Sequence, residues 1–307
     1  MQKVIFLMGP TAAGKTDIAV QAAMEFAVDL VSVDSALIYK GMDIGTAKPD
    51  AETLARAPHA LIDLIEPEQS FSVAEFCQHA IAAIEKSHQA GRTPLLVGGT
   101  MMYFNALQYG LSQLPEADPA IRQELSDKAL AMGWEAMHAE LQKIDPQSAR
   151  RIHPNDSQRI QRALEIYRVS GQSMTSMLAQ QPKHEFPYQV LKLVSAWQDR
   201  ELLRERIALR FAQILDQGFV NEVALLRQRP GLSKQQPSMR SVGYRQMWEY
   251  LDGLLTYDEM KEQAVIATRQ LAKRQYTWLR KQQDAHWYHM DESGSSAQIM
   301  LKMADFV

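Results

Sequence analysis

Four residues near the start of the chain have the types and spacing needed to bind a phosphate group. Gly9, Gly14, Lys15 and Thr16 fit the pattern G-x-x-x-x-G-K-[ST], in which backbone N–H groups face a polyphosphate, the lysine adds positive charge and the hydroxyl can bind Mg²⁺. The apolar run at 4–7 predicts a buried strand, and apolar spacing after Thr16 predicts a helix. This order of elements aims a helix N-terminus at an anion. The predicted P-loop consists of Gly9, Pro10, Thr11, Ala12, Ala13, Gly14, Lys15 and Thr16.

The composition is that of an ordinary globular protein. Of its 307 residues, 46% are hydrophobic and 22% are charged, and no apolar run approaches the roughly 20 residues that cross a bilayer. We expect no signal peptide, because the chain enters its first predicted strand at once, and Cys77 alone cannot form an internal disulfide or a cysteine zinc site. The expected location is the cytoplasm. The net charge of −3 argues against indiscriminate nucleic-acid binding but permits a local basic patch.

Apolar runs separated by helical patterns predict an α/β fold. Strands are expected at residues 4–7, 30–33, 60–65, 95–97 and 190–194, and the chain after 194 is expected to be helical. From 115 to 187 the pattern changes to helices without strands. We therefore predict a P-loop NTPase-like parallel sheet flanked by helices, with a helical insertion domain and a helical C-terminal part. The expected boundaries are 1–114 and 188–307 for the two parts of the core, with 115–187 as the insertion.

Polar side chains at strand ends are candidates for the chemistry. Asp34 follows the second predicted strand, and ligands of open α/β sheets bind beyond the carboxyl ends of the strands. Its position fits either a residue of the ligand cleft or a simple turn cap. The strand at 95–97 runs into Gly98-Gly99-Thr100 without an acidic residue. Nucleotide hydrolases usually place a second Mg²⁺-binding acid at such a position, so this argues against an ATPase.

The C-terminal third carries basic residues in two patterns. Around Arg210, arginines alternate with glutamates, which is typical of a solvent-exposed helix face. From 264 to 281 the predicted helix has no acid, and Arg269, Lys273, Tyr276 and Arg280 share one face. A basic face that includes an aromatic residue favours an anionic partner.

Longer strings of sequence resemble one enzyme family. The strings at 9–16, 34–49, 97–100, 153–156, 240–248 and 268–275 are similar to those of bacterial tRNA dimethylallyltransferases (tRNA isopentenyltransferases), and the resemblance spans nearly the whole chain. The eukaryotic branch of that family carries a C-terminal zinc finger, for which this chain lacks the cysteines.

The resemblance implies a reaction and its participants. Family members transfer a dimethylallyl group from dimethylallyl diphosphate to N6 of the adenosine 3′-adjacent to the tRNA anticodon. It implies that Asp34 is the general base, that Lys15, Thr16 and Arg210 act on the diphosphate, and that Mg²⁺ binds Thr16. The expected partners are the diphosphate and the anticodon stem-loop of tRNA; we expect no membrane association, and a monomer by default. The residues that match tRNA contacts of the family are Asp34, Ser35, Ala36, Leu37, Thr100, Arg122, Gln158, Arg159, Ile160, Gln161, Arg162, Arg240, Ser241, Val242, Gly243, Tyr244, Arg245, Lys273, Arg274, Gln275, Tyr276, Thr277, Trp278, Leu279 and Arg280.

Two other functions fit parts of the sequence. An ATP-dependent small-molecule kinase of the nucleoside-monophosphate type would explain the P-loop, Mg²⁺ and a mobile insertion, but not the basic helix near the C-terminus. A non-enzymatic RNA-binding protein with a vestigial P-loop would explain the basic surfaces, but not the intact Lys15 and Thr16 beside Asp34.

Overall fold

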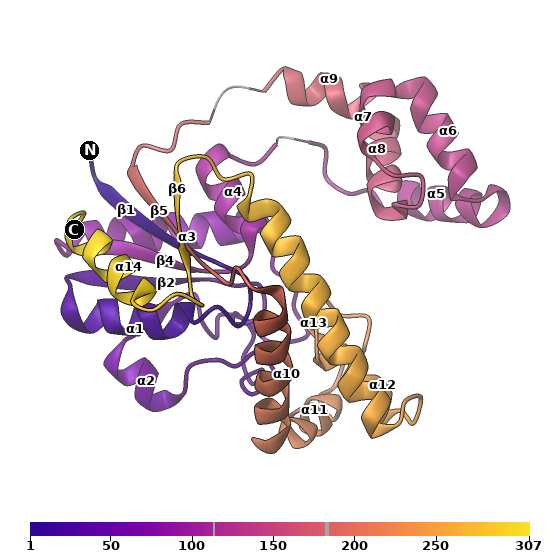
Figure 1. The fold of residues 1–307 in the computed structure, drawn as a ribbon. Helices are drawn as coiled ribbons and strands as arrows, with labels where there is room; N and C mark the ends of the chain where they lie inside the picture. The colour runs from indigo at the N-terminus through magenta and orange to yellow at the C-terminus, as the bar shows by residue number, and fades with distance from the viewer. Residues whose placement is uncertain (113, 182–183) are drawn as a thin grey trace. The chain divides into compact units, whose positions relative to one another are not determined.

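The computed structural model describes residues 1–112, 114–181 and 184–307, which form two compact units (Figure 1). The core unit comprises Met1–Gln108 and Phe186–Val307, and the insertion unit comprises Tyr109–Glu185. The insertion unit thus begins a few residues before the predicted boundary at 115 and ends just before 187.

A parallel sheet of six strands forms the centre of the core unit, in the order β3-β2-β4-β1-β5-β6. Strand β1 lies between β4 and β5, where Ile5 pairs with Leu95 on one side and Leu191 on the other. The predicted α/β class is confirmed. The strands are β1 Lys3–Met8, β2 Val28–Val33, β3 His59–Ala60, β4 Thr93–Gly98, β5 Gln189–Ala196 and β6 Ala285–His289.

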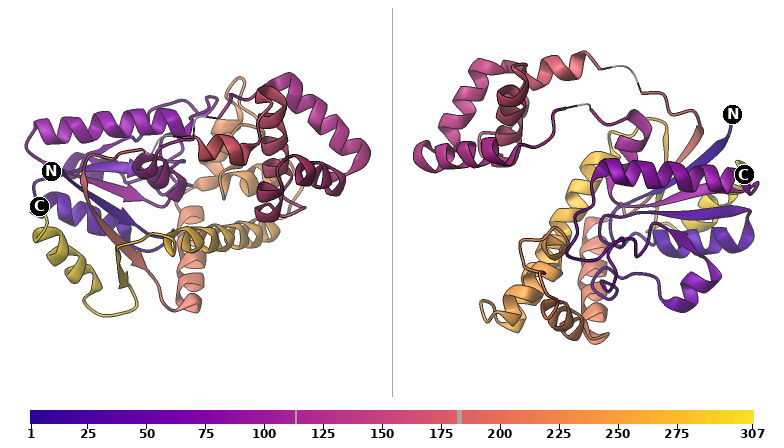
Figure 2. Two further views of the ribbon diagram at one scale, coloured as in Figure 1. Left: turned by 90° about the horizontal axis from the view of Figure 1, so that it is seen from above. Right: turned by 180° about the vertical axis from the view of Figure 1, so that it is seen from behind.

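Helices cover both faces of this sheet, as Figure 2 shows. Alternate side chains of β1 enter different cores: Phe6 packs in the cluster with residues of α3 and α4, and Ile5 in the cluster with residues of α1 and α14. This two-sided burial explains why the run at 4–7 is continuously apolar. The covering helices are α1 Lys15–Glu25, α3 Val73–Gln89, α4 Met101–Tyr109 and α14 Ser295–Ala304.

A helical layer follows β5 and completes the core unit. Its own apolar core includes Phe211, Phe219, Tyr244 and Met260, together with Ile38 from the segment after β2. In the described part of the chain, no helix is long and apolar enough to cross a membrane. The remaining elements of the core unit are α2 Ala51–Arg56, α10 Arg200–Asp216, α11 Phe219–Arg227, the 3₁₀ helix η1 Ser238–Arg240, α12 Tyr244–Leu251 and α13 Tyr257–Leu279.

The insertion unit is a small helical bundle with its own core, which includes Leu125, Met137, Leu141 and Ile160. Its helices start and stop at residues suited to those positions. Asp118 accepts N–H bonds at the start of the first helix, and Gly171 ends the fourth with a left-handed φ of 71°. The helices are α5 Pro119–Met132, α6 Trp134–Ile144, α7 Pro146–Arg151, α8 Ser157–Ser170 and α9 Met174–Ala179.

Two secondary-structure predictions are wrong. The strand expected at 60–65 is limited to His59–Ala60, because Leu61 and Asp63 adopt left-handed φ values of 65° and 54° that end the strand. The chain after 194 is not wholly helical. Strand β6 pairs in parallel with β5, from Lys192 opposite Ala285 to Ala196 opposite His289.

We predict that Phe76→Ala lowers the free energy of unfolding by about 3–5 kcal/mol, the usual cost of deleting a buried phenyl ring. Phe76 is fully buried and stacks on Tyr103 with ring centroids 4.1 Å apart. Urea denaturation followed by circular dichroism measures the change. Gln78→Ala, at an exposed position of the same helix, is the matched control and should change stability by no more than about 0.5 kcal/mol. Equal effects of the two substitutions would contradict the packing described here.

Candidate active site

The segment 9–16 leaves the carboxyl end of β1 and enters α1, as the P-loop prediction requires. Gly14 is the N-cap with a left-handed φ of 72°, and Ala12 also has a positive φ, 62°. A left-handed conformation costs a non-glycine residue about 1–2 kcal/mol. Gly9 has no room for a side chain, because a Cβ there would lie 2.2 Å from the Ser195 carbonyl oxygen.

Three side chains from other elements hold this loop. The Trp197 indole N–H donates to the Ala12 carbonyl (3.0 Å), and the Ser195 hydroxyl donates to the Ala13 carbonyl (2.5 Å). Gln275 accepts the Thr11 N–H at 2.9 Å. Backbone N–H groups of a P-loop are expected to face the phosphates, but the Thr11 N–H of this loop binds within the protein. These contacts stabilise the left-handed residue at the tip of the loop.

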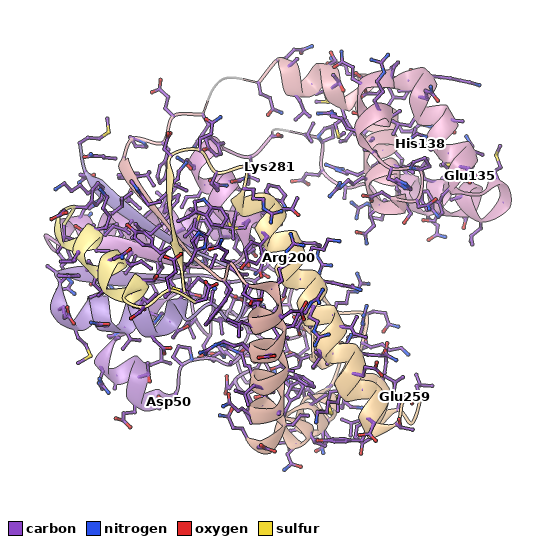
Figure 3. The ribbon with its side chains drawn as sticks, viewed as in Figure 1. Asp50, Glu135, His138, Arg200, Glu259 and Lys281 are labelled. Carbon is purple, nitrogen blue, oxygen red and sulfur yellow. The ribbon has the colours of Figure 1, made fainter. Side chains whose placement is uncertain are left out.

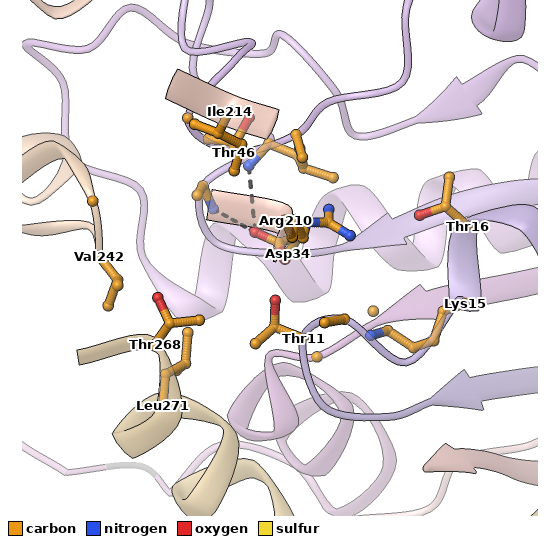
Figure 4. A pocket seen from close by; sticks show the side chains of 18 of the residues that line it. Thr11, Lys15, Thr16, Asp34, Thr46, Arg210, Ile214, Val242, Thr268 and Leu271 are labelled. Carbon is orange, nitrogen blue, oxygen red and sulfur yellow. Dashed lines mark hydrogen bonds between the residues drawn. The ribbon is translucent and has the colours of Figure 1, made fainter. Parts of the chain in front are cut away.

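The loop forms one wall of a cavity of about 450 Å³. In the view of Figure 4, Lys15 and Thr16 lie at one side, Val242, Thr268 and Leu271 lie at the other, and Asp34 and Arg210 lie between them. The cavity therefore combines a cationic end with walls that include apolar side chains. The four predicted catalytic residues, Lys15, Thr16, Asp34 and Arg210, all line it.

The charges in the cavity perturb one another. Lys15 is partly buried, and its ammonium donates to the Pro10 carbonyl oxygen at 2.7 Å. Burial lowers the pKa of Lys15 to about 8; the Asp34 carboxylate opposes this shift and Arg210 adds to it. Burial also lowers the pKa of Arg210, against the opposing effects of Asp17 and Asp34. The site thus holds two poorly solvated cations that an anionic ligand would stabilise.

Asp34 both caps a turn and lines the cavity, so the two roles left open by the sequence are compatible. Its Oδ1 accepts the N–H groups of Ala36 (2.8 Å) and Leu37 (3.4 Å). These bonds fix the carboxylate at the end of β2. Its Oδ2 accepts no hydrogen bond from the residues that the structure describes, so one oxygen of the carboxylate is left for a ligand.

A further wall is held by Glu222, which no sequence pattern singled out. Its carboxylate accepts the N–H groups of Asp43 (2.9 Å), Ile44 (2.7 Å) and Gly45 (3.1 Å), together with the Tyr244 hydroxyl (2.6 Å). Burial, and then the charge of Glu222, raise the pKa of Tyr244, so that this phenol stays a donor. A Cβ on Gly45 would lie 2.2 Å from Phe219. The cavity-lining residues Thr46 and Ala47 follow directly, so Glu222 fixes the segment that carries them.

The predicted tRNA-contacting residues of the core unit divide into exposed and inward-facing side chains. Ser35 donates its N–H to the Thr100 hydroxyl at 3.1 Å, which joins the segments after β2 and β4. Val242 and Tyr244 both line the cavity, and Tyr244 also packs in the core of the helical layer, whereas Leu279 is fully buried and serves the core alone. The exposed members are Ser35, Arg240, Arg245, Lys273, Arg274, Thr277, Trp278 and Arg280.

Helix α13, Tyr257–Leu279, begins with a capping box in which Thr256 and Glu259 bind each other, and Glu259 and Lys281 mark its two ends in Figure 3. The predicted basic face borders a cavity of about 620 Å³ that α10 also lines, through residues that include Arg200 and Arg204. Tyr276 lies on this face, but its hydroxyl bonds the Trp197 backbone rather than projecting into solvent. The face is therefore basic, with its aromatic residue used for packing and hydrogen bonding.

The predicted contacts of the insertion unit centre on a buried carboxylate. Glu165 is fully buried and pairs with Arg122 (2.9 Å) and Arg162 (2.7 Å). Burial raises the pKa of Glu165, but hydrogen bonds from both arginines and the Asp118 N–H outweigh it and hold that pKa below its usual value. Gln161 donates to the Arg122 carbonyl at 3.0 Å, and Ile160 is buried in the bundle core. Gln158 and Arg159 are exposed.

Sequence reasoning missed Ser195 and Trp197 as well as Glu222. The first two lie at the carboxyl end of β5, the edge where ligands of such sheets bind, so their position was an available signal. Glu222 gave none, because the three backbone N–H groups that it binds lie about 180 residues away along the chain.

We predict that Glu222→Ala exposes the amides of residues 43–45 to hydrogen exchange, because three N–H groups lose the carboxylate that accepts them. Each such bond typically stabilises a protein by about 1 kcal/mol, so exchange of this segment should accelerate at least several-fold. Deuterium uptake measured by mass spectrometry on a peptide covering 41–48 reads this directly. Tyr244→Phe, which removes only the phenol donor, is the control with a smaller effect. Unchanged uptake in Glu222→Ala would contradict the role given to this carboxylate.

The chain is similar to characterised proteins over most of its length. A family model described as IPP transferase matches residues 37–282. A tRNA dimethylallyltransferase of Alkalilimnicola ehrlichii is 55% identical over 279 residues, which are 91% of this chain and 88% of that protein.

Solved structures agree. The tRNA isopentenylpyrophosphate transferase of Bacillus halodurans superposes with a TM-score of 0.73 at 36% identity, covering 99% of this chain and 96% of that one. A second such transferase, from Staphylococcus epidermidis, gives 0.70 at 29% identity over 99% of both chains. A eukaryotic dimethylallyltransferase acting on tRNA shares the fold, with a TM-score of 0.80 at 23% identity over all of this chain and 79% of that one. A glycine loop, a carboxylate and two cations in one cavity, in a chain so similar to these proteins, lead to one assignment: the chain belongs to the IPP transferase family.

Proposed function

We propose that this protein transfers the dimethylallyl group of dimethylallyl diphosphate to N6 of the adenosine 3′-adjacent to the anticodon of tRNA. One observation carries this proposal: Lys15, Thr16 and Arg210 line the same cavity as Asp34. A cationic end suits a diphosphate leaving group, and a carboxylate beside it suits an amine that must lose a proton.

The cationic end acts on the leaving group. Breaking the allylic C–O bond sends its electron pair to the diphosphate, where negative charge grows. Lys15, Arg210 and residues 12–16 line the cavity, and their charges and N–H groups would act on that charge as fixed donors, which lower the energy of a transition state. Thr16 is exposed at the start of α1 and lines the cavity, so its hydroxyl would hold Mg²⁺, which takes oxygen ligands. When bound, Mg²⁺ would add further charge stabilisation to the leaving group.

Asp34 acts on the acceptor. The N6 amine is a weak nucleophile, and it must lose a proton as the bond from N6 to the allylic carbon forms. With Oδ1 committed to the turn, Oδ2 is the oxygen that accepts this proton. The turn bonds also keep the carboxylate from rotating away from the acceptor.

The tRNA would lie on the exposed basic residues. An adenosine in an anticodon loop must leave its stack to enter the cavity, at a cost of a few kcal/mol. Phosphate contacts with Lys273, Arg274 and Arg280, and stacking on the exposed Trp278, would offset that cost. In the insertion unit, Gln158 and Arg159 are the exposed candidates for RNA contact. A cytoplasmic monomer is part of this proposal.

The kinase alternative is not favoured. Strand β4 ends in Gly98 without the acidic residue that a nucleotide-hydrolysing site usually places there, and the family of the chain is that of prenyl transferases.

The proposed reaction is tested by incubating unmodified tRNA with the protein, Mg²⁺ and dimethylallyl diphosphate, and measuring the nucleosides by mass spectrometry. A parallel reaction replaces the diphosphate with ATP. A prenyl mass on one adenosine beside the anticodon, only with the allylic diphosphate, is the expected result. Absence of prenyl product with several tRNAs would contradict the proposal, and phosphate transfer from ATP to a small acceptor would favour the kinase.

We predict that Asp34→Asn slows transfer by roughly 10²–10⁴-fold, the usual contribution of a general base, while binding of the diphosphate changes little. Asparagine keeps an Oδ1 that can cap Ala36 and Leu37, so the turn survives and only the proton acceptor is lost. Single-turnover rates and equilibrium binding separate the two effects. Asp29→Asn, at the opposite end of β2, is the matched control. Wild-type turnover in Asp34→Asn would remove Asp34 from the mechanism.

We predict that affinity for dimethylallyl diphosphate falls as the pH rises through about 8, because Lys15 loses its proton in the empty site there. The bound anion favours charged Lys15, so binding takes up a proton above the pKa of the empty site, and affinity should fall by up to about tenfold per pH unit. Equilibrium binding between about pH 7 and pH 9.5 measures the slope. Lys15→Arg keeps its charge and should remove the dependence. A slope of the same size in Lys15→Arg would assign the titration to another group.

A further inference from the structure

We propose that Gln275 of α13 is a positioning residue for the diphosphate loop, acting through the Thr11 N–H. The resemblance placed Gln275 among the tRNA contacts, but its half-buried side chain points to the loop and to the end of β4. This inference rests on the proposed function for the identity of the anion, and it assigns this side chain to the diphosphate site.

The side-chain amide of Gln275 joins two segments. Its Oε1 accepts the Thr11 N–H at 2.9 Å, and its Nε2 donates to the Gly99 carbonyl at 3.0 Å. The two partners fix the orientation of the amide, because a backbone N–H can only donate and a carbonyl can only accept. Gly99 leaves the room for this contact, since a Cβ there would lie 2.4 Å from Nε2. Position 275 therefore requires a side chain that carries both an acceptor, for the Thr11 N–H, and a donor, for the Gly99 carbonyl.

The contact falls where the loop most needs support. Thr11 directly precedes Ala12, the left-handed residue at the loop tip, and the Ala12 carbonyl is held by Trp197. An unfavourable backbone conformation persists only where the surrounding structure determines it. With Thr11 fixed on one side and the Ala12 carbonyl on the other, the N–H groups of the following residues are oriented before the anion arrives.

The neighbouring residue on α13 supports the same loop indirectly. The Tyr276 hydroxyl donates to the Trp197 carbonyl (2.7 Å) and accepts the Trp197 N–H (2.9 Å), and the Trp197 indole in turn binds Ala12. Two consecutive side chains of one helix thus hold both ends of the Thr11–Ala12 segment. The same turn of α13 exposes Lys273 and Arg274, the proposed RNA contacts. The inward-facing residues of this turn therefore support the diphosphate loop, and its outward-facing residues contact RNA.

The role of Gln275 in anion binding rather than RNA binding is tested with three variants of the full-length protein. Gln275→Ala removes both bonds, and Gln275→Glu keeps an acceptor for Thr11 but places a carboxylate oxygen against the Gly99 carbonyl. Gln263→Ala deletes the same side chain at an exposed position of α13 and is the matched control. Titration calorimetry with Mg²⁺ and inorganic pyrophosphate measures the anion site. Fluorescence anisotropy with an unmodified anticodon stem-loop measures RNA binding, and thermal unfolding reports folding of each variant.

We expect Gln275→Ala to weaken pyrophosphate binding on the order of tenfold, since a hydrogen bond that orients the loop is lost, and Gln275→Glu to weaken it further. Stem-loop affinity should stay within about twofold in all variants, and Gln263→Ala should match the wild type. In steady state, KM for the allylic diphosphate should rise more than kcat falls. Rescue of pyrophosphate affinity by Gln275→Glu would contradict the need for the donor to Gly99.

Two results would overturn the inference: unchanged pyrophosphate affinity in both Gln275 variants, or a loss of stem-loop affinity as large as the loss for pyrophosphate. The second would return Gln275 to the RNA contacts. If the wild type binds pyrophosphate and Gln275→Ala weakens that binding, while no tRNA accepts a prenyl group, the proposed function fails and the positioning role of Gln275 stands.

Discussion

The left-handed turn at Ala12 is the constraint on which the arrangement of the site depends. A non-glycine residue does not hold this conformation alone, and here the contacts that support it come from distant parts of the chain: Ser195 and Trp197 at the carboxyl end of β5, and Gln275 from α13. The sheet order, with β1 beside β5, brings these groups to one edge. The conformation of the 9–16 loop therefore depends on the fold of the core unit.

The charge balance at the same edge explains how one cavity can serve two chemistries. Lys15 and Arg210 are both poorly solvated, and Asp34 opposes the fall in the pKa of each. An arriving diphosphate would stabilise both cations, while the turn bonds keep Asp34 in place as an acceptor. Two cations and one carboxylate thus share a cavity of about 450 Å³, and in the proposed reaction the cations would act on the leaving group and the carboxylate on the acceptor. A parallel sheet brings these side chains together, because the carboxyl ends of its strands lie at one edge and ligands bind beyond that edge.

The sequence predicted the features that depend on the spacing of residues close together in the chain. The glycine loop follows a strand buried on both faces, as the apolar run at 4–7 and the glycine spacing predicted. The strand at 60–65 was wrong because left-handed residues interrupt an apolar run, and β6 was missed because it is short and follows a long helix. The family resemblance indicated a diphosphate-binding role for Arg210, although the local sequence pattern around it indicated a solvent-exposed helix face.

The sequence did not predict contacts between segments that lie far apart in the chain. The backbone groups that Glu222 and Gln275 bind lie 176 or more residues away, so no window of sequence contains both ends of these bonds. For the same reason, the resemblance alone could not distinguish exposed Arg274 from inward-facing Gln275, or show that Ile160, Tyr244 and Leu279 are buried. Spacing identifies a segment, whereas packing decides which side chains of that segment meet a ligand.

The central claim is that one cavity holds the diphosphate against Lys15 and the acceptor amine against Asp34. The most direct test is a crystal structure of the protein with Mg²⁺, an unreactive thiolo analogue of dimethylallyl diphosphate and an unmodified anticodon stem-loop. The claim predicts the diphosphate on the 9–16 loop and an Asp34 carboxylate oxygen about 2.6–3.2 Å from N6 of one unstacked adenosine, the range of a proton-transfer contact. A diphosphate bound outside that loop, or an adenosine whose N6 faces another residue, would contradict it.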